Sequence, residues 1–369
     1  MKAMLLAAGV GSRLEPLTTQ VPKPLVPIAN VPVMEHMMRL LKAHGITEVY
    51  ANLHYLPHKI TEYFGDAEKL GMKLTCRYEE QLSGDAGGVR SMKEHLIDGT
   101  FIVVMGDLLT DADLTSIIRE HKDKKALASI ALKRVDDVTR FGIVVQNQDG
   151  FITGFQEKPA VEDALSDLAS TGIYILEPEV FSHIPETGEF GFGRQLFPQL
   201  VAKGLPVLGI EMAKGTYWSD VGAIPQYLEA NFDAIEGTVK LETEEFVSES
   251  ISGAQHGGKP ASDRLLGAGT TVHETAKIDA ILMTGKNCEI AANAKLSGRV
   301  ILGDNCIVEE GASLTDCLVW ADSKIGRNSE LNNTVVAGNT TVEPNSRHDR
   351  AALVPQKAEP KKLASNGVK

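Results

Sequence analysis

The sequence predicts an α/β protein in which a Rossmann-like, mostly parallel sheet with helices on both faces precedes a parallel β-helix. Two observations support this fold class. Over residues 1–234, short apolar runs alternate with amphipathic segments that carry apolar residues at three- and four-residue spacing. Beyond residue 268, apolar residues recur every 17 or 18 positions. The first pattern is typical of strands alternating with covering helices, and the second is typical of stacked coils.

The alternating region contains clear strand-like and helix-like segments. The strand-like runs are 48–53, 74–78, 101–105, 128–132 and 172–176, and the helix-like segments are 33–44, 57–68 and 114–122. Alternating residues on either side of Asp149 and Gly150 also predict a hairpin between Ile143 and Phe155. Because ligands collect beyond the carboxyl ends of strands in such sheets, the charged motifs that follow these strands are the candidate site residues.

Three rows of apolar residues define the C-terminal repeat. The rows are Val272, Ile290, Ile307, Ile325 and Val342; Ile278, Leu296, Leu314 and Leu331; and Met283, Ile301, Val319 and Val336. The rows are offset by about six residues and separated by Asn, Asp and Gly, which predicts three short strands and three turns in each coil.

Composition shifts divide the chain into four parts. Residues 1–234 form the α/β domain, a turn-rich linker covers 235–268, and the β-helix covers 269–344. The tail 345–369 mixes Pro, Lys, Ala and Ser without a period, and we expect it to be disordered.

Charge and apolar content limit the partners of the protein. The net charge of −12 and the pI near 5.4 argue against nucleic acid or an anionic membrane as the main partner. No stretch reaches the ~18 apolar residues of a membrane span, and the N-terminal apolar run is too short for a signal peptide. The four cysteines show no CxxC spacing. We therefore expect a cytoplasmic protein that binds phosphates through a few placed cations or metal ions.

The strongest chemical motif follows the N-terminal apolar strand. Gly9 and Gly11 allow backbone N–H groups to approach an anion closely, and Arg13 stands at the exit of the loop. Lys23 follows ten residues later, between two prolines. A dinucleotide-binding loop would need a third glycine, and a P-loop would end in Gly-Lys-Ser/Thr. The sequence therefore predicts another kind of phosphate loop, with a turn carrying surface cations as the simpler alternative.

Two aspartates close strands further along the chain. Asp107 follows the apolar run 101–105 and one glycine, and Asp220 follows the run 217–219. A carboxylate at a strand end is well placed to bind Mg²⁺, which prefers one or two carboxylates together with phosphate oxygens. Each aspartate alone could instead form a turn or cap a helix. Together they predict a metal site.

Two further segments could contact the remainder of a ligand. Glu157 and Lys158 are neighbours on a strand and point to opposite faces unless a break intervenes, for which Pro159 supplies a reason. Glu157 could accept hydrogen bonds from sugar hydroxyls while Lys158 binds a phosphate, or the two could form a surface ion pair. The glycine-dense stretch 84–88 fits close approach to a flat base or a simple flexible loop.

These motifs resemble those of the nucleotide-sugar pyrophosphorylases, the sugar-phosphate nucleotidylyltransferase family. The opening pattern GxGxRLxPLT runs from Gly9 to Thr18, and PKPL runs from Pro22 to Leu25. Matching motifs follow in family order at 106–107, 141–142, 157–159, 170–174 and 218–222. The resemblance covers residues 1–234 as the nucleotidyltransferase domain. The C-terminal repeat resembles the left-handed β-helix that many members carry.

The resemblance implies a role for each candidate residue. Arg13, Lys23 and Asp107 would be catalytic, and Asp107 and Asp220 would hold Mg²⁺ as the cofactor. The nucleotide would be bound by Ala8, Gly9, Gly11, Ser12, Gly84 and Gly87. The sugar phosphate would be bound by Gly142, Glu157, Lys158 and Thr171.

The resemblance also implies substrates. The segment around residues 79–88 looks like the mannose-1-phosphate guanylyltransferase branch, where Glu-x-x-Leu-Gly-Thr-Ala-Gly is usual, although Asp85 stands here at the Thr position. The implied reaction joins mannose-1-phosphate and GTP into GDP-mannose and pyrophosphate, with uridylyl or thymidylyl transfer to glucose-1-phosphate as the alternative.

A non-catalytic regulatory subunit of the same architecture is a second alternative, but such chains usually lose the arginine, lysine or aspartate that are present here. Acyl transfer by the β-helix is not supported, because His273 is the only candidate base within the coils. We expect the β-helix to mediate homo-oligomerisation.

Overall fold

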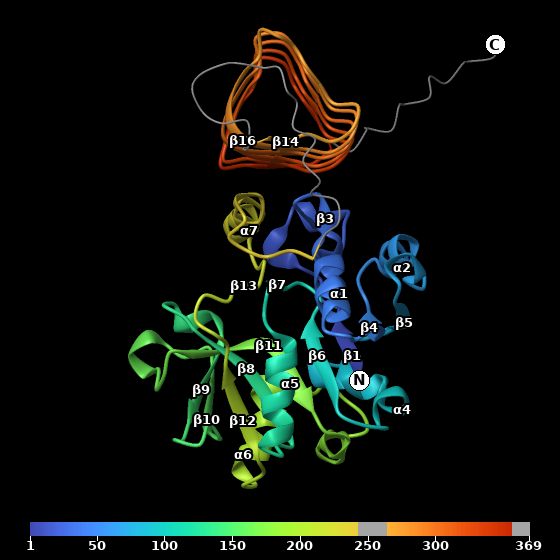
Figure 1. Ribbon diagram of the computed structural model, residues 1–369, viewed down its shortest axis with the longest axis vertical. Coiled ribbons are helices and arrows are strands. Elements are labelled where there is room, and N and C mark those ends of the chain that lie inside the picture. Colours follow the sequence, from blue (N-terminus) through green and yellow to red (C-terminus); the bar gives the residue numbers. More distant parts are fainter. Residues whose placement is uncertain (243–263, 356–369) are drawn as a thin grey trace, which may run out of the picture. The chain divides into compact units, whose positions relative to one another are not determined.

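Two compact units make up the chain in the computed structural model, Met1–Glu245 and Phe246–Lys369 (Figure 1). The structure describes residues 1–242 and 264–355. Each unit has its own apolar core. No helix in these described ranges has the length and apolar character needed to cross a membrane.

A nine-stranded sheet forms the centre of the first unit. β1 (Lys2–Leu6) lies between β4 (Glu48–Leu53) and β6 (Phe101–Met105) and is parallel to both, and β5 (Lys73–Tyr78) continues the parallel half beside β4. The other half is mixed. It contains β8 (Ala128–Arg134), β9 (Gly142–Gln146), β10 (Ile152–Glu157), β11 (Leu168–Leu176) and β12 (Val207–Glu211). β11 runs antiparallel to β6, β8 and β9, and the predicted hairpin is the antiparallel pair β9–β10.

Helices cover both faces of this sheet, as the alternating side chains of β1 require. Ala3 and Leu5 pack in one apolar cluster with α1 (Val33–Ala43), α2 (Pro57–Phe64) and α5 (Leu114–Asp123). Met4 and Leu6 pack in the cluster on the opposite face with α3 (Asp85–Ser91), α4 (Lys93–Leu96) and α6 (Phe197–Ala202). The remaining strands of this unit are the two-residue β2 (Pro27–Ile28), β3 (Val31–Pro32), β7 (Leu109–Thr110) and β13 (Trp218–Ser219), and the remaining α-helix is the 13-residue α7 (Ile224–Glu236). The expected Rossmann-like α/β architecture is confirmed.

Two segments of the first unit differ from the sequence prediction. α2 ends at Phe64, four residues before the predicted end, because Gly65 adopts a left-handed φ of 56°. The stretch 84–88 is not a loop, since α3 begins at Asp85. Its residues from Ala86 to Val89 are buried, and this burial outweighs the low helix propensity of the two glycines.

Parallel strands stacked coil upon coil form the second unit, which confirms the predicted β-helix (Figure 1). One sheet contains β14 (Arg264–Leu265), β16 (Lys277–Thr284), β18 (Lys295–Leu302), β20 (Ser313–Val319), β22 (Glu330–Asn332), β23 (Val335–Val336), β25 (Arg347–Asp349) and β26 (Ala352–Leu353). A second sheet contains β15 (Thr271–Val272), β17 (Glu289–Ile290), β19 (Ile307–Val308), β21 (Lys324–Ile325) and β24 (Thr341–Val342). Equivalent turns in four successive coils have a residue with a left-handed φ, namely Asn287, Asn305, Asp322 and Asn339.

Two of the three predicted apolar rows shift by one residue. Ile290 pairs with Val308 rather than with Ile307, which is 37% exposed. The third row passes from Ile301 to Leu318 instead of Val319, because a bulge changes the register from 18 to 17 residues between Ser297 and Val300. The row through Ile278, Leu296, Leu314 and Leu331 is confirmed.

The β-helix begins earlier and ends later than predicted. β14 lies within the predicted linker and pairs with β16, and β25 and β26 lie within the predicted disordered tail. The last coil shows little apolar periodicity, but ladder hydrogen bonds such as Val335 N–H to Ala351 O at 2.9 Å order its backbone. The other parts of the predicted linker and tail, at 243–263 and 356–369, lie outside the described residues.

A buried polar network joins α5 to the sheet. His121 is fully buried, with Nδ1 2.7 Å from Ser129 Oγ and Nε2 3.0 Å from Glu177 Oε1. Because an ionised carboxylate only accepts hydrogen bonds, Nε2–H donates to Glu177 and Nδ1 accepts from the Ser129 hydroxyl. Burial lowers the pKa of His121 below its ordinary value, although the Glu177 carboxylate opposes this change.

We expect the free energy of unfolding to fall as the pH drops below about 6.5, the ordinary histidine pKa, because the unfolded chain then binds a proton more readily than the folded chain. The contribution of His121 is fully present above that pH and is lost as the pH falls toward its lowered folded pKa. His121→Gln should remove this part of the pH dependence in urea denaturation at pH 5.5 and 7.5. His58→Gln, at an exposed position on α2, is the matched control. An unchanged pH dependence in His121→Gln would contradict the prediction.

Candidate active site

The loop after β1 leaves its backbone open in front of a buried lysine. Gly11 adopts a left-handed φ of 73° before the short 3-10 turn η1 (Ser12–Leu14). A Cβ on Gly11 would lie 2.9 Å from the Lys23 Cβ, so a side chain there would push the loop away from Lys23. A Cβ on Gly9 would meet nothing within 4 Å, while Ala8 is buried beneath the loop. This open backbone is what an anion-binding loop requires.

Lys23 is the buried cation of the site. It begins the 3-10 turn η3 (Lys23–Leu25) and is 6% exposed. Its ammonium group forms an ion pair with the Asp107 carboxylate and donates a hydrogen bond to Asp220 O at 3.2 Å. A buried ammonium group needs such partners, because its loss of hydration is costly. Lys23 therefore joins the loop after β1 to the chain beyond β6 and β13.

Asp220 contacts two arginines. Its Oδ1 accepts a hydrogen bond from Arg140 Nη2 at 2.9 Å, and its Oδ2 lies 3.9 Å from Arg13 Nη1. Asp220 follows β13, which pairs with β7, and β7 begins two residues after Asp107. This pairing brings the two predicted metal ligands to the same edge of the fold.

The sequence analysis did not identify Arg140. Its guanidinium lies 5.1 Å from the centroid of the Phe141 ring, and that ring contacts Trp218 edge-on at 5.0 Å. The aromatic contacts hold the guanidinium beside Asp220. In the sequence, Arg140 is a basic residue in a polar segment, with nothing that distinguishes it from a surface arginine. Its position directly before the motif Phe141–Gly142 was the one available signal.

The donor set of Asp107 and Asp220 fits a divalent cation. The two carboxylates are 31% and 22% exposed, and Mg²⁺ commonly takes one or two carboxylates and completes its shell with phosphate oxygens and water. The described residues contain no cluster of three or more His, Cys, Asp or Glu side chains of the kind that holds a metal without a ligand. The donors therefore suit a cation that arrives with a phosphate compound.

Three of the residues predicted to bind the sugar phosphate lie together at the end of the hairpin. Gly142 pairs with Glu157, and a Cβ on Gly142 would lie 3.1 Å from Glu157 Oε2. Lys158 adopts a φ of 50°, so the strand breaks directly after Glu157 and the Lys158 Nζ turns to within 3.9 Å of Glu157 Oε1. The break between the two residues is therefore present in the structure.

Thr171 does not join this group through its side chain. Its hydroxyl donates to Ala131 O at 2.8 Å and the residue is 1% exposed, which contradicts a sugar contact by this hydroxyl. The reason is its position in the irregular stretch between Ser170 and Tyr174, where the register of β11 against β8 shifts and the hydroxyl reaches a β8 carbonyl. Its carbonyl accepts from Trp218 Nε1 at 2.9 Å, so Thr171 instead anchors the segment that carries Asp220.

Gly84 and Gly87 are packed against protein. A Cβ on Gly84 would lie 2.5 Å from Phe190 O, and one on Gly87 would lie 2.8 Å from the Ser83 side chain. Gly87 N–H also donates to Phe190 O at 3.0 Å. Glycine at 84 therefore allows the start of α3 to approach Phe190, and glycine at 87 leaves room for the Ser83 side chain; a nucleotide contact by their backbones stays a prediction.

Asn52 and Glu79 form a buried polar link that the sequence analysis also missed. Asn52 Oδ1 accepts from Ala7 N–H at 3.2 Å, and its Nδ2 donates to Glu79 Oε1 at 2.7 Å. Glu79 Oε2 accepts from the backbone N–H and the hydroxyl of Ser83 at 3.0 and 2.7 Å. The link ties the loop after β1 to the start of α3. The signal in the sequence was a polar residue, Asn52, next to the end of the apolar strand β4.

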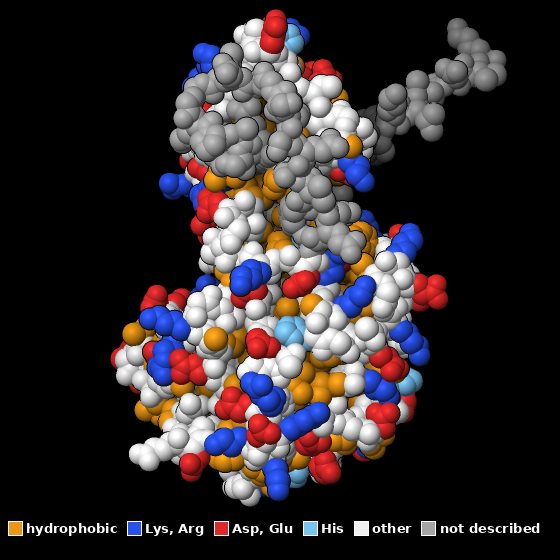
Figure 2. All heavy atoms as spheres, viewed as in Figure 1, with side chains coloured by type: hydrophobic (Ala, Val, Ile, Leu, Met, Phe, Trp, Pro, Cys, Tyr) orange, Lys and Arg blue, Asp and Glu red, His pale blue; other side chains and the backbone are white. Residues whose placement is uncertain are grey.

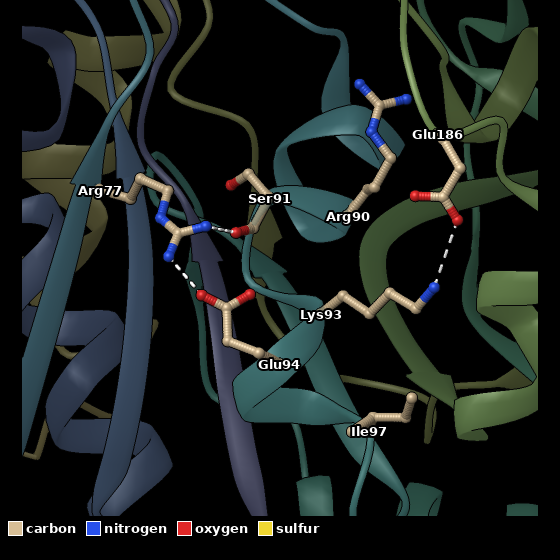
Figure 3. Close-up of a pocket in the computed structure, with 7 residues that line it drawn as sticks. All are labelled: Arg77, Arg90, Ser91, Lys93, Glu94, Ile97 and Glu186. Carbon is tan, nitrogen blue, oxygen red and sulfur yellow. Dashed lines mark hydrogen bonds and ion pairs between the residues drawn. The ribbon is translucent and has the colours of Figure 1, made fainter.

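A separate hollow of about 430 Å³ lies beside α3 and α4 (Figure 3). Its cations already have partners, since Arg77 pairs with Glu94 and Lys93 lies 3.4 Å from Glu186. Arg90 donates to two backbone carbonyls. The hollow contains none of the candidate residues. On the visible face of the first unit, basic and acidic side chains are interspersed (Figure 2), so the placed cations of the loop site remain the better phosphate ligands.

Known protein families match both units of the chain. The Nucleotidyl transferase family model matches residues 2–237, and the GMPPB C-terminal domain model matches residues 279–362. A UTP–glucose-1-phosphate uridylyltransferase from Synechocystis is 42% identical over 243 residues, 62% of each chain. A mannose-1-phosphate guanylyltransferase from Mycobacterium tuberculosis is 33% identical over 236 residues, 64% of this chain and 65% of the relative. These alignments span less than two thirds of each relative's length.

A solved structure is also similar to the chain. It is a Bacillus anthracis chain described as a glucose-1-phosphate thymidylyltransferase in complex with sucrose. The match has a TM-score of 0.58 at 28% identity and covers 63% of this chain and 95% of that chain.

We expect Asn52→Ala to lower the free energy of unfolding by about 1–3 kcal/mol, because it leaves the buried Glu79 carboxylate and the Ala7 N–H without this partner. Urea denaturation measures the change. Glu80→Ala removes an exposed neighbouring carboxylate and is the matched control. Equal stability of the two variants would show that the link contributes nothing.

Proposed function

Because the chain belongs to the nucleotidyl transferase family, whose model matches residues 2–237, we propose that it is a sugar-1-phosphate nucleotidylyltransferase. The observation that carries the proposal is the group of three cations and two carboxylates, in which Lys23 pairs with Asp107 while Arg13 and Arg140 flank Asp220. A cation group beside an open glycine loop suits a triphosphate, and the paired carboxylates suit the divalent cation that accompanies it.

In the proposed reaction, a phosphate oxygen of the sugar-1-phosphate attacks the α-phosphorus of an NTP. A new P–O–P bond forms, the bond between the α-phosphorus and its bridging oxygen breaks, and pyrophosphate leaves with that oxygen. A phosphate monoester is already ionised at neutral pH, so no strong general base is needed. Catalysis then rests on holding the two phosphates in line and on compensating charge.

The residues divide this work between them. Arg13 and Lys23 would bind the triphosphate and compensate the charge of the departing pyrophosphate. Lys158, which is 54% exposed at the break after β10, would bind the phosphate of the sugar. Asp107 and Asp220 would hold Mg²⁺, which supplies charge compensation at the phosphate oxygens.

In the free protein, the cations that would bind phosphates pair with the carboxylates that would hold the metal. The buried Lys23 side chain is held in place by Asp107 and by Asp220 O before a substrate binds, and the more exposed Arg13 lies 3.9 Å from Asp220. With Mg²⁺ held by the two carboxylates, the same cations would be available to phosphate oxygens. The entropy cost of placing Lys23 is met in the folding of the protein.

For the substrates we favour mannose-1-phosphate and GTP, giving GDP-mannose. The GMPPB C-terminal domain match and the named guanylyltransferase relatives support this pair. The second candidate is glucose-1-phosphate with UTP, which the 42% identical relative favours. Homo-oligomerisation through the β-helix and a cytoplasmic location stay predictions.

A pyrophosphate-release screen tests the function. It combines ATP, CTP, GTP, UTP and dTTP with mannose-1-phosphate, glucose-1-phosphate and glucosamine-1-phosphate in the presence of Mg²⁺. We expect release with the largest kcat/KM for GTP and mannose-1-phosphate, and loss of release when EDTA removes the metal. A larger value for UTP and glucose-1-phosphate would select the second candidate. No release with any pair would contradict the reaction class and favour a non-catalytic subunit.

Arg13→Ala and Asp107→Asn should each lower kcat about 10²–10³-fold, the usual effect of removing one group that stabilises transition-state charge. Arg119→Ala, at an exposed position on α5, is the control and should retain wild-type turnover. Thermal melting of each variant checks that the fold is retained. Turnover within a few-fold of wild type in either site variant would contradict the mechanism.

A further inference from the structure

Asp85 is a half-buried carboxylate with one oxygen bound and one oxygen available. Its Oδ1 accepts the backbone N–H of Phe192 at 2.6 Å and that of Ala86 at 2.8 Å. In the described part of the chain, no other residue donates a hydrogen bond to Oδ2. The two N–H contacts hold the carboxylate in one orientation at the start of α3.

The segment around Phe192 also borders Glu157. A Cβ on Gly191 would lie 3.4 Å from Asp85 Oδ1, and a Cβ on Gly193 would lie 2.7 Å from Glu157 Oε2. Glycine at both positions therefore leaves room for the two carboxylates on either side of Phe192. The backbone of this short segment therefore adjoins both carboxylates.

The electrostatics agree that these groups are neighbours. Burial raises the pKa of Asp85, and the negative charge of Glu157 adds to the rise. Burial also raises the pKa of Tyr174, with smaller contributions from Asp85 and Glu157. The Tyr174 ring contacts the Phe192 ring at 4.8 Å. The two carboxylates thus lie near the same buried aromatic pair, and their shared negative charge suits a polar ring that brings hydrogen-bond donors.

The charge near the pair is incompletely compensated. Glu157 has Lys158 at 3.9 Å, whereas the contacts of Asp85 in the described chain are backbone N–H groups. A ligand at this place should bring donors rather than more negative charge. The hydroxyl groups of a sugar ring are such donors, whereas a phosphate is not.

We propose that Asp85 is a specificity-determining residue whose free oxygen accepts a hydrogen bond from a ring hydroxyl of the sugar phosphate, beside Glu157. The inference rests on the proposed function, which supplies the sugar phosphate. The substrate class is a hexose-1-phosphate with a free hydroxyl at the position that Asp85 reads. A half-buried acceptor rejects an analogue without that hydroxyl, because the carboxylate is then left without its donor.

Asp85→Asn separates this role from the packing role of the residue. The amide oxygen still accepts the N–H groups of Phe192 and Ala86, while the NH₂ group replaces the free carboxylate oxygen. The experiment measures kcat and KM for the sugar phosphate and the NTP selected by the screen. It repeats the measurement with the 2-, 3-, 4- and 6-deoxy analogues of that sugar phosphate. Glu186→Gln, an exposed carboxylate beside the separate hollow, is the matched control.

We expect Asp85→Asn to lower kcat/KM for the parent sugar phosphate about 10-fold, as for a lost hydrogen bond to a charged group, with an unchanged KM for the NTP. For one deoxy analogue, wild type and variant should differ less than about 2-fold, because the hydroxyl that Asp85 reads is absent. Glu186→Gln should behave as wild type with every substrate.

Three results would overturn the inference. A change in the KM of the NTP alone would make Asp85 a nucleotide contact, and equal losses on all deoxy analogues with a lowered melting temperature would make it a packing residue. Wild-type kinetics in Asp85→Asn would show that it has no role in the reaction. These results leave the reaction class intact. If wild type turns over no substrate pair, the proposed function fails and this inference fails with it.

Discussion

The ion pair between Lys23 and Asp107 is the interaction on which the candidate site depends. Lys23 is almost fully buried and Asp107 is 31% exposed, so loss of the carboxylate would leave the buried ammonium charge without compensation. The lysine also donates to Asp220 O, so one ammonium group connects the loop after β1, the end of β6 and the segment after β13. Three parts of the chain that are far apart in sequence are thereby held at one edge of the sheet.

Under the proposed function, this arrangement would allow an acidic protein to bind phosphates. The chain has a net charge of −12, yet Arg13, Lys23 and Arg140 lie around the two carboxylates Asp107 and Asp220. Each carboxylate pairs with a cation in the free protein and is also a hard oxygen ligand suited to a divalent cation. The same five groups can therefore serve the fold and, under the proposed function, the transfer of a nucleotidyl group.

Comparison of the sequence with the structure shows which predictions local pattern supports. The strands β4 and β6 and the helix α1 agree closely with their predicted ranges, because the strands are nearly continuous buried runs and the helix buries an apolar face with helical spacing. In the β-helix the row through Leu296 and Leu314 was correct, but the row beyond Ile301 was displaced by the bulge near Gly298. A bulge depends on how two neighbouring coils pair, and the sequence of one coil does not specify it.

The sequence by itself determined the α/β alternation, the coil repeat, and the separate motifs that carry Arg13, Lys23, Asp107 and Asp220, since each of these features is readable within a short window of residues. The fold brings the four motifs together. The tertiary structure alone decided that Arg140 joins Asp220 across 80 positions, and that Asn52 links Ala7 to Glu79. It also decided that the Thr171 hydroxyl faces Ala131 rather than a ligand. The physical reason is that a polar side chain takes its partner from whatever the folded chain brings within about 3 Å, and local sequence carries no record of that distance.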